Sequence, residues 1–246
     1  MTLELALLVC VAFSLGGVLK GATGAGAPFF AVPLMAILVD VPFAVAVFLI
    51  PNVISNAWQI WHYRDDFPET RFAARFALAG VVGAGIGTVA LAGLSSAILV
   101  ASVAIIVLVY VAFRLMNPAW KLDWVTANKI VLPVGTIGGF FQGAIGLSAP
   151  VSITFMNAVR LERRAFIATM SLYFFAMALI QFPTQVVFGI MTFERFVYSA
   201  LATIPLLAGL PIGNFLARHL SSKAFDRIIL GVLTLLALRL LARAIA

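Results

Sequence analysis

The chain has 246 residues, of which 63% are hydrophobic and only 10% are charged. A soluble domain carries roughly a quarter charged residues and about half apolar ones, so this chain has too few polar side chains to cover a water-soluble globule. The net charge of +7 does not indicate a nucleic-acid-binding protein, because the basic residues are scattered between apolar runs instead of clustered on one face. The composition predicts an integral membrane protein whose partner is the lipid bilayer.

In chain order, each half opens with a long apolar stretch that Gly and Pro interrupt, followed by three unbroken apolar runs. The first half contains the broken stretch 3–39 and the runs 43–61, 72–93 and 97–116. The second half contains the broken stretch 130–159 and the runs 165–188, 196–217 and 224–241. A bilayer core requires about 20 apolar residues per helix. Each unbroken run therefore predicts a transmembrane helix, and each broken stretch predicts a helical hairpin that enters the membrane and returns.

Basic residues concentrate in or beside four connectors between these segments, at 62–75, 117–127, 159–165 and 218–227. The intervening connectors 39–42 and 93–97 carry no Lys or Arg. If each broken stretch is a hairpin, all four basic connectors lie on one side of the membrane, which is then the cytoplasmic side. We therefore predict a multi-pass protein of the inner (plasma) membrane with both termini outside.

The two broken stretches contain a repeated motif. Residues 16–28 read GGVLKGATGAGAP and residues 138–150 read GGFFQGAIGLSAP, with Gly, Gly, Gly, Ala, Gly, Ala and Pro at identical offsets. A second pair of blocks, Gly83-x-Gly85-x-Gly87 and Gly209-x-Pro211-x-Gly213, follows in the same order. Because the halves begin on opposite faces, we predict two inverted repeats, 1–118 and 119–246, in one all-α polytopic domain. Such repeats with interrupted helices recur in secondary transporters.

The motif is typical of a helix that breaks at glycines and restarts with proline in its first turn, at Pro28 and Pro150. A break at membrane depth leaves backbone amides in need of partners, and the restarting helix points its positive dipole end into the break. Two such ends that meet from opposite faces favour a small anionic solute. Tight helix packing is the alternative explanation of the glycines, and we favour it for the second pair of blocks.

Several polar residues accompany the motif. Lys20 directly precedes the first break, where a buried lysine is a functional candidate, although its side chain could instead extend to the cytoplasmic surface. Three amide side chains recur at helical spacing in the run 43–61, where they either line a cavity or join helices by hydrogen bonds. The candidate substrate-binding residues are Lys20, Gly21, Thr23, Gly24, Gly26, Pro28, Asn52, Asn56, Gln59, Gln142, Gly143, Gly146, Ser148, Pro150 and Gln181. We expect no catalytic residue, metal site or cofactor.

The hairpin segments 21–28 and 143–150 resemble the TauE/SafE family of sulfite and organosulfonate exporters, which includes permeases of the 4-toluenesulfonate-uptake type. The resemblance covers nearly the whole chain. It implies alternating-access export of small sulfur-containing anions, such as sulfite or sulfonates, across the plasma membrane of a bacterium or archaeon. Gln142 stands where the first half has Lys20, so the two halves need not contribute equally to the site.

Two other functions compete with this interpretation. An anion channel or passive facilitator would have the same composition. An intramembrane enzyme is suggested by residues 146–149, which resemble the serine loop of rhomboid proteases, but Ser148 would need a histidine partner and both histidines lie at segment ends. Every acidic residue also falls at or near a segment end, so the sequence offers no intramembrane carboxylate to carry a proton or bind sodium. We therefore expect uncoupled, electrogenic efflux.

Overall fold

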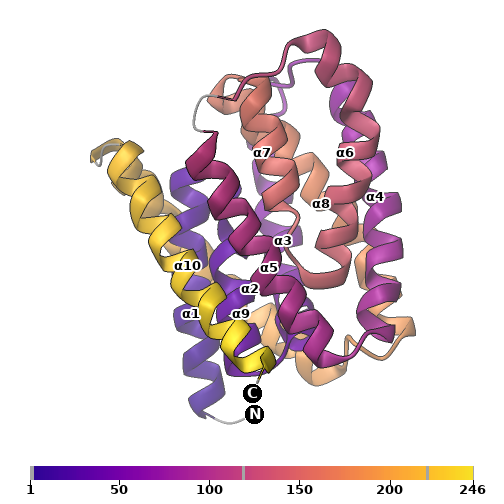
Figure 1. Cartoon of the computed structure of the whole chain (residues 1–246), viewed down its shortest axis with the longest axis vertical. Helices are drawn as coiled ribbons and strands as arrows, with labels where there is room; N and C mark the ends of the chain where they lie inside the picture. The colour runs from indigo at the N-terminus through magenta and orange to yellow at the C-terminus, as the bar shows by residue number, and fades with distance from the viewer. Residues whose placement is uncertain (1–2, 118–119, 220–221, 246) are drawn as a thin grey trace.

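Figure 1 shows the computed structural model of the chain, a helical bundle. The structure describes residues 3–117, 120–219 and 222–245, and over these ranges every regular element is a helix. In chain order the helices are α1 (Leu3–Thr23), α2 (Ala27–Leu38), α3 (Val41–His62), α4 (Thr70–Gly93), α5 (Ser96–Met116), α6 (Trp124–Ile145), α7 (Ala149–Val159), α8 (Arg163–Val187), α9 (Phe193–His219) and α10 (Ser222–Ile245). The predicted all-α class is confirmed.

Six helices are long and apolar enough to cross a bilayer: α1, α3, α4, α5, α8 and the Phe193–Ala217 part of α9. The predicted multi-pass membrane fold is therefore confirmed, and five of the six unbroken runs correspond to these candidate spans. The sixth run, 224–241, forms α10, which is not among the candidate spans found in the described residues. Each broken stretch forms a long arm and a short arm. The short arms α2 and α7 have 12 and 11 residues, well below the length of about 20 that a span requires.

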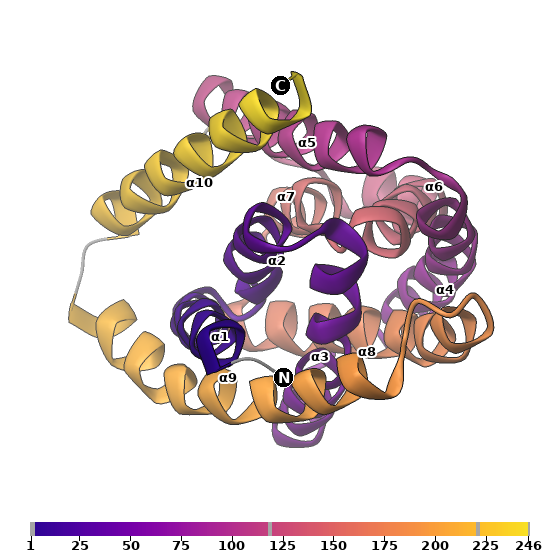
Figure 2. The ribbon, with the colours of Figure 1, turned by 90° about the horizontal axis from the view of Figure 1, so that it is seen from below.

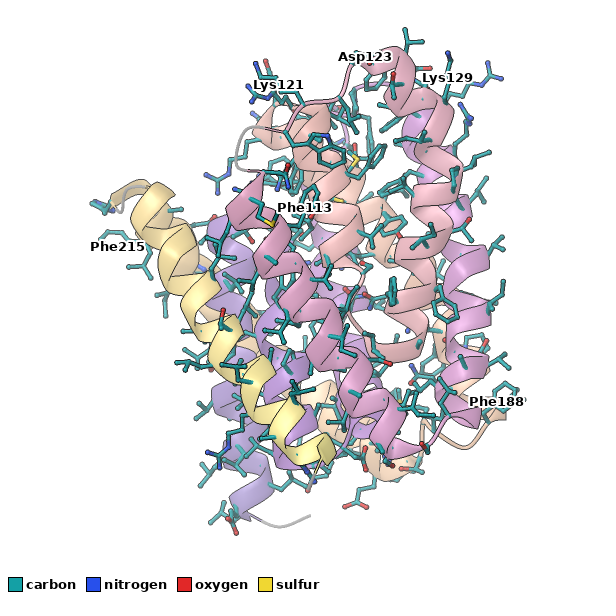
Figure 3. The ribbon with its side chains drawn as sticks, in the orientation of Figure 1. Phe113, Lys121, Asp123, Lys129, Phe188 and Phe215 are labelled. Carbon is teal, nitrogen blue, oxygen red and sulfur yellow. The ribbon has the colours of Figure 1, made fainter. Side chains whose placement is uncertain are left out.

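Three connectors that carry basic residues meet at one end of the bundle (Figures 1 and 3). The amide of Leu122 donates to the carbonyl oxygen of Ala158 at 2.8 Å, and Arg164 pairs with Asp66 at 3.0 Å. We call this end, with the connectors 63–69, 120–123 and 160–162, the basic end. The fourth predicted basic connector, 218–227, lies largely outside the described side chains.

The opposite end, here the terminal end, contains the connectors 39–40, 94–95 and 188–192 (Figure 1). Arg195 at the start of α9 lies 3.9 Å from the Asp40 carboxylate, and Arg243 of α10 donates to the carbonyl oxygen of Ala36 at 3.1 Å. The helix α1 begins and α10 ends at this end. For three of the four basic connectors, the placement at the end opposite the non-basic connectors agrees with the sequence-based expectation.

Two aspartates fix where helices begin. Asp40 accepts a hydrogen bond from the Phe43 amide at 2.5 Å and caps α3, and Asp123 accepts one from the Thr126 amide at 2.9 Å and caps α6. Hydrogen bonds from Thr126 hold the pKa of Asp123 below its ordinary value. The starts of α3 and α6 are thus anchored at opposite ends of the bundle.

Glycine allows the long hairpin arms to pack backbone to backbone on their neighbours, α6 on α4 and α1 on α9. A Cβ added to Gly83 or Gly87 would overlap a carbonyl oxygen of α6, and one added to Gly209 or Gly213 would overlap a carbonyl oxygen of α1. Gly85 has only an ordinary side-chain neighbour. The packing role predicted for the second pair of glycine blocks is therefore confirmed for four of these five glycines. Seen along the bundle (Figure 2), α2 and α7 lie inside a ring of longer helices.

Candidate functional site

The first hairpin breaks at Gly24, whose φ of +88° is a conformation that only glycine adopts without strain. The amide of Gly24 still donates to the Lys20 carbonyl oxygen at 2.7 Å. The Thr23 hydroxyl donates to the Leu19 carbonyl oxygen at 2.8 Å and accepts from the Gly26 amide at 2.9 Å. Pro28 lies in the first turn of the restarting helix α2. The break is thus a tight turn that the Thr23 side chain caps.

The second hairpin breaks in the same way at Gly146, which has a φ of +73°. The Gly146 amide donates to the Gln142 carbonyl oxygen at 2.9 Å, and the Ser148 amide donates to the Gln142 side-chain oxygen at 3.3 Å. Ser148 is the N-cap residue of α7, but its hydroxyl lies 3.2 Å from the Ser152 hydroxyl and caps no backbone amide. Pro150 again occupies the first turn.

We expected the breaks to leave backbone amides free to bind an anion, but two of these amides are already hydrogen-bonded. The Gly26 and Ser148 amides are held by Thr23 and Gln142 in the conformation seen here. An anion that reaches either amide must replace the oxygen of that side chain. The helix ends still direct their positive dipoles into the breaks.

Lys20 lies behind the first break and is buried, with 3% of its surface exposed. Its ammonium group donates to Asn56 Oδ1 at 2.6 Å, so the alternative in which it extends to the membrane surface is wrong. The Asn56 amide group donates in turn to Asn52 Oδ1 at 2.6 Å, and Asn52 donates to the Phe174 carbonyl oxygen at 3.3 Å. Lys20 is the one charged residue among the buried residues that the structure describes.

Two glutamines tie the hairpins to the helices that follow them. Gln59 of α3 donates to the Gly24 carbonyl oxygen at 3.3 Å and accepts from the Ser171 hydroxyl at 3.0 Å. Gln181 of α8 donates to the Gln142 carbonyl oxygen at 3.3 Å. The polar candidates therefore form two buried hydrogen-bonded groups, one beside each break. Gly21 and Gly143 take no part in it, because their Cα atoms face the backbones of α9 and α4.

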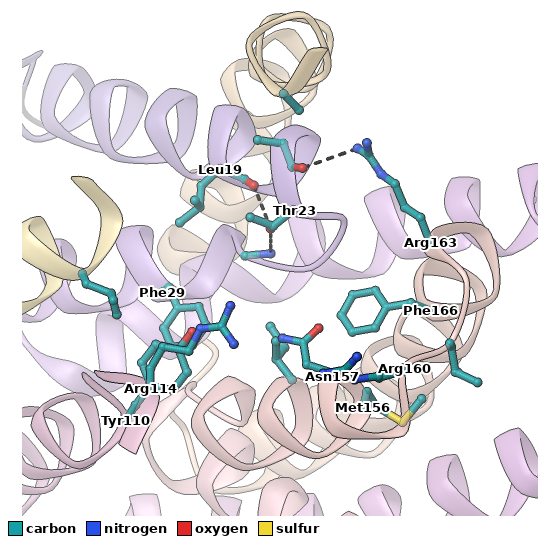
Figure 4. Close-up of a pocket in the computed structure, with 16 residues that line it drawn as sticks. Leu19, Thr23, Phe29, Tyr110, Arg114, Met156, Asn157, Arg160, Arg163 and Phe166 are labelled. Carbon is teal, nitrogen blue, oxygen red and sulfur yellow. Dashed lines mark hydrogen bonds between the residues drawn. The ribbon is translucent and has the colours of Figure 1, made fainter. Parts of the chain in front are cut away.

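A cavity of about 470 Å³ opens at the basic end, between the tip of the first hairpin, the last turns of α5 and α7, and the start of α8 (Figure 4). This volume lies in the usual range of small-molecule sites. Arg114, Arg160 and Arg163 line it together with Thr23 and Asn157, and its described lining contains no carboxylate. A second cavity of about 360 Å³ adjoins it and shares Arg114, Asn157 and Arg160.

Two of these arginines have distinctive local geometry. Arg160 is the one residue other than glycine, among those described, that has a positive φ (57°). Such a conformation is costly and persists where the surroundings enforce it. Arg163 donates to the carbonyl oxygens of Gly21 and Ala22 at 3.5 and 3.4 Å, next to the negative end of the α1 dipole. These contacts hold the Arg163 guanidinium group beside the first break.

Of the fifteen predicted site residues, Thr23 and Gly26 line this cavity. The others lie behind the hairpin tip or in helix packing. Sequence reasoning missed Arg114, Asn157, Arg160 and Arg163, because scattered basic residues at segment ends are typical of any membrane surface. The one available signal was that Arg160 and Arg163 directly follow the short arm of the second hairpin.

Interrupted helices inside a membrane bundle recur in secondary transporters, and a cation-lined cavity beside such a break fits that class. More narrowly, the chain belongs to the sulfite exporter TauE/SafE family, which matches residues 8–240. The resemblance based on the hairpin segments is confirmed, and so is the expectation that the protein is a transporter and not an enzyme. Comparisons with curated proteins and with solved structures give no match to this chain.

Proposed function

We propose that the protein exports small sulfur-containing anions, such as sulfite or organic sulfonates, and that the structure corresponds to its inward-facing state. The observation that carries this proposal is the cavity at the basic end, where three guanidinium groups surround a space that leads to the first hairpin break. By the distribution of basic connectors, this end faces the cytoplasm and both termini lie outside. Family membership implies the sulfur-containing substrate.

Alternating access is supported by the likeness of the two halves. Gly24 and Gly146 adopt positive φ at the same motif position, and both restarting helices begin with an αR N-cap residue and have proline two residues after it. The packing of α1 on α9 corresponds to that of α6 on α4. The first break lies beside the connector 160–162 at the basic end, whereas the α6–α7 turn lies toward the terminal end (Figure 1). We infer inverted repeats at 1–118 and 119–246, which could rock around a shared site.

An open channel is less well supported. Beyond the first break, the polar side chains toward the terminal end are closed off from solvent: Ser148 and Gln185 have 0% of their surface exposed, and Gln181 has 1%. A cavity that is open at one end and closed beyond its tip is expected of an alternating-access protein in one of its states.

Charge reversal in the cavity tests the proposal. We expect Arg160→Glu to reduce the initial rate of sulfite and sulfoacetate efflux roughly tenfold, because a charged cleft raises the local concentration of an oppositely charged solute by at least that factor. The rates are measured in oriented vesicles, with binding to purified protein compared for sulfite, sulfoacetate, taurine and acetate.

The matched control is Arg71→Glu, which makes the same charge change at an exposed residue of the basic end that does not line the cavity. It should transport at nearly the wild-type rate. An equal loss in both variants would attribute the effect to general surface charge. Tight binding of a neutral or cationic solute by the wild type would contradict anion transport itself.

A second prediction concerns the driving force. No carboxylate is buried in the described part of the chain, so no carboxylate there can carry a proton or bind sodium within the bundle. A potential of 100 mV, negative inside, drives one anionic charge outward with about 2.3 kcal/mol. We therefore expect efflux from proteoliposomes to follow an imposed potassium diffusion potential. Efflux that ignores this potential and follows a pH gradient would contradict uncoupled transport.

A further inference from the structure

The buried face of α8 carries two glutamines, Gln181 and Gln185, one helical turn apart. The NH2 group of Gln181 donates a hydrogen bond to the Gln142 carbonyl oxygen of the second hairpin. Its side-chain oxygen has no hydrogen-bond partner in the part of the chain that the structure describes. Gln185 is fully buried, and neither its side-chain nitrogen nor its oxygen has a described partner. Buried amide groups are nearly always paired, because an unpaired one loses its hydrogen bonds to water without replacement.

Packing does not account for Gln185. A leucine or methionine of similar size would fill the same place and leave no polar atom unpaired. An unpaired buried amide therefore lowers the stability of this conformation. Such a group suggests a partner that is present in another state of the protein.

The two glutamines lie toward the terminal end of the bundle, away from the cavity at the basic end. The carbonyl oxygen of Gln185 accepts from the Ile190 and Met191 amides at 2.8 and 3.0 Å, in the turn between α8 and α9 at the terminal end. Gln181 contacts the second hairpin at Gln142. Since α8 starts at Arg163 in the cavity, it runs along the whole distance from the entrance to these amides.

We propose that Gln181 and Gln185 form a second, outer binding station for the transported anion, occupied when the terminal end opens. This inference rests on the proposed function. The NH2 group of Gln185 can donate two hydrogen bonds to the oxygens of a sulfite or sulfonate group. Its side-chain oxygen and that of Gln181 would accept from water that accompanies the anion.

The inner cavity and the outer station differ in charge. The inner cavity presents three fixed positive charges, which attract an anion from dilute solution. The outer station presents neutral amide donors, with no charged residue buried beside them in the described structure. A transported ion must bind well enough to enter and weakly enough to leave. Capture by guanidinium groups and release from amides satisfies both requirements for export.

The test is Gln185→Leu in reconstituted vesicles and in detergent. We expect sulfite efflux to fall at least about tenfold, because the station loses both of its N–H donors. Equilibrium binding of sulfite to the detergent-solubilised, inward-facing protein should stay unchanged. The melting temperature should equal or exceed that of the wild type, because the variant no longer buries an unpaired amide.

The control is Thr184→Val. The native Thr184 hydroxyl donates to the Ile180 carbonyl oxygen of its own helix at 2.7 Å. The efflux rate of this variant should match that of the wild type.

Each result decides a separate question. A Gln185→Leu protein that transports at the wild-type rate would overturn the outer station and leave the proposed function intact. Gln185→Met provides a second apolar side chain of similar length. If both variants lose stability together with flux, the glutamine is structural and the station is rejected. A wild-type protein that moves neither sulfite nor sulfonate would instead overturn the proposed function.

Discussion

Replacing Lys20 with glutamine is expected to slow anion efflux about hundredfold while leaving the fold intact. Lys20 is buried, and among the buried residues that the structure describes it is the one charged side chain. Its ammonium group is held by a neutral acceptor, Asn56 Oδ1, at 2.6 Å. A buried cation with no buried carboxylate to pair with is unfavourable. An anion that moves past the first break would relieve that cost.

The size of the effect follows from the charge. Two opposite unit charges 4 Å apart attract with about 4 kcal/mol at an effective dielectric constant of about 20. That energy corresponds to nearly three powers of ten in binding. Desolvation of the anion offsets part of it, which leaves a change of about hundredfold in transport. The readout is the initial rate of sulfite efflux at a concentration well below saturation.

Glutamine is the informative substitution because it removes the charge and can keep the hydrogen bond to Asn56. The second half already carries Gln142 at the matching motif position. Lys20→Met removes both charge and hydrogen bond, so it should lose stability as well, since Asn56 is left without its donor. If Lys20→Gln transports at the wild-type rate and Lys20→Met does not, the lysine acts through its hydrogen bond, and a role for its charge is excluded.

The sequence predicted the helices well because bilayer thickness imposes a simple rule. A run of apolar residues of spanning length has few alternatives to a transmembrane helix. The broken hairpins were also predictable, because Gly24 and Gly146 need positive φ and the following prolines mark where a helix restarts. The capping of these breaks by Thr23 and Gln142 was not, because it depends on side-chain conformations that no periodicity encodes.

The cavity escaped prediction for a related reason. Arg114 lies far along the chain from Arg160 and Arg163, and the fold brings them together at the ends of α5, α7 and α8. Basic residues at helix ends look the same in the sequence whether they face lipid head groups or a shared cavity. The unpaired side-chain amide of Gln185 likewise depends on how the helices pack. In the sequence, Gln185 is one more polar residue near the end of an apolar run.

Alanine at Gly87 or Gly213 is expected to lower the free energy of unfolding by about 3 kcal/mol, near the upper end for an overpacked core. A Cβ at Gly87 would overlap the carbonyl oxygen of Phe140 on α6, and one at Gly213 would overlap that of Val18 on α1. Backbone atoms cannot move aside as flexible side chains do, so each pair of helices must separate. The measurement is thermal unfolding of each variant in detergent.

Gly93→Ala provides the matched control, because a Cβ at Gly93, at the end of the same helix as Gly87, meets no atom within 4 Å. Its stability should equal or slightly exceed that of the wild type, since alanine favours helix over glycine by up to about 1 kcal/mol. The comparison between Gly87→Ala and Gly213→Ala also tests the inferred repeats. Similar losses in both would support the view that each long hairpin arm is held rigidly on its own glycine-bearing helix. A loss at Gly87 alone would contradict the inference that the two halves pack alike, and with it the symmetry on which rocking between two states depends.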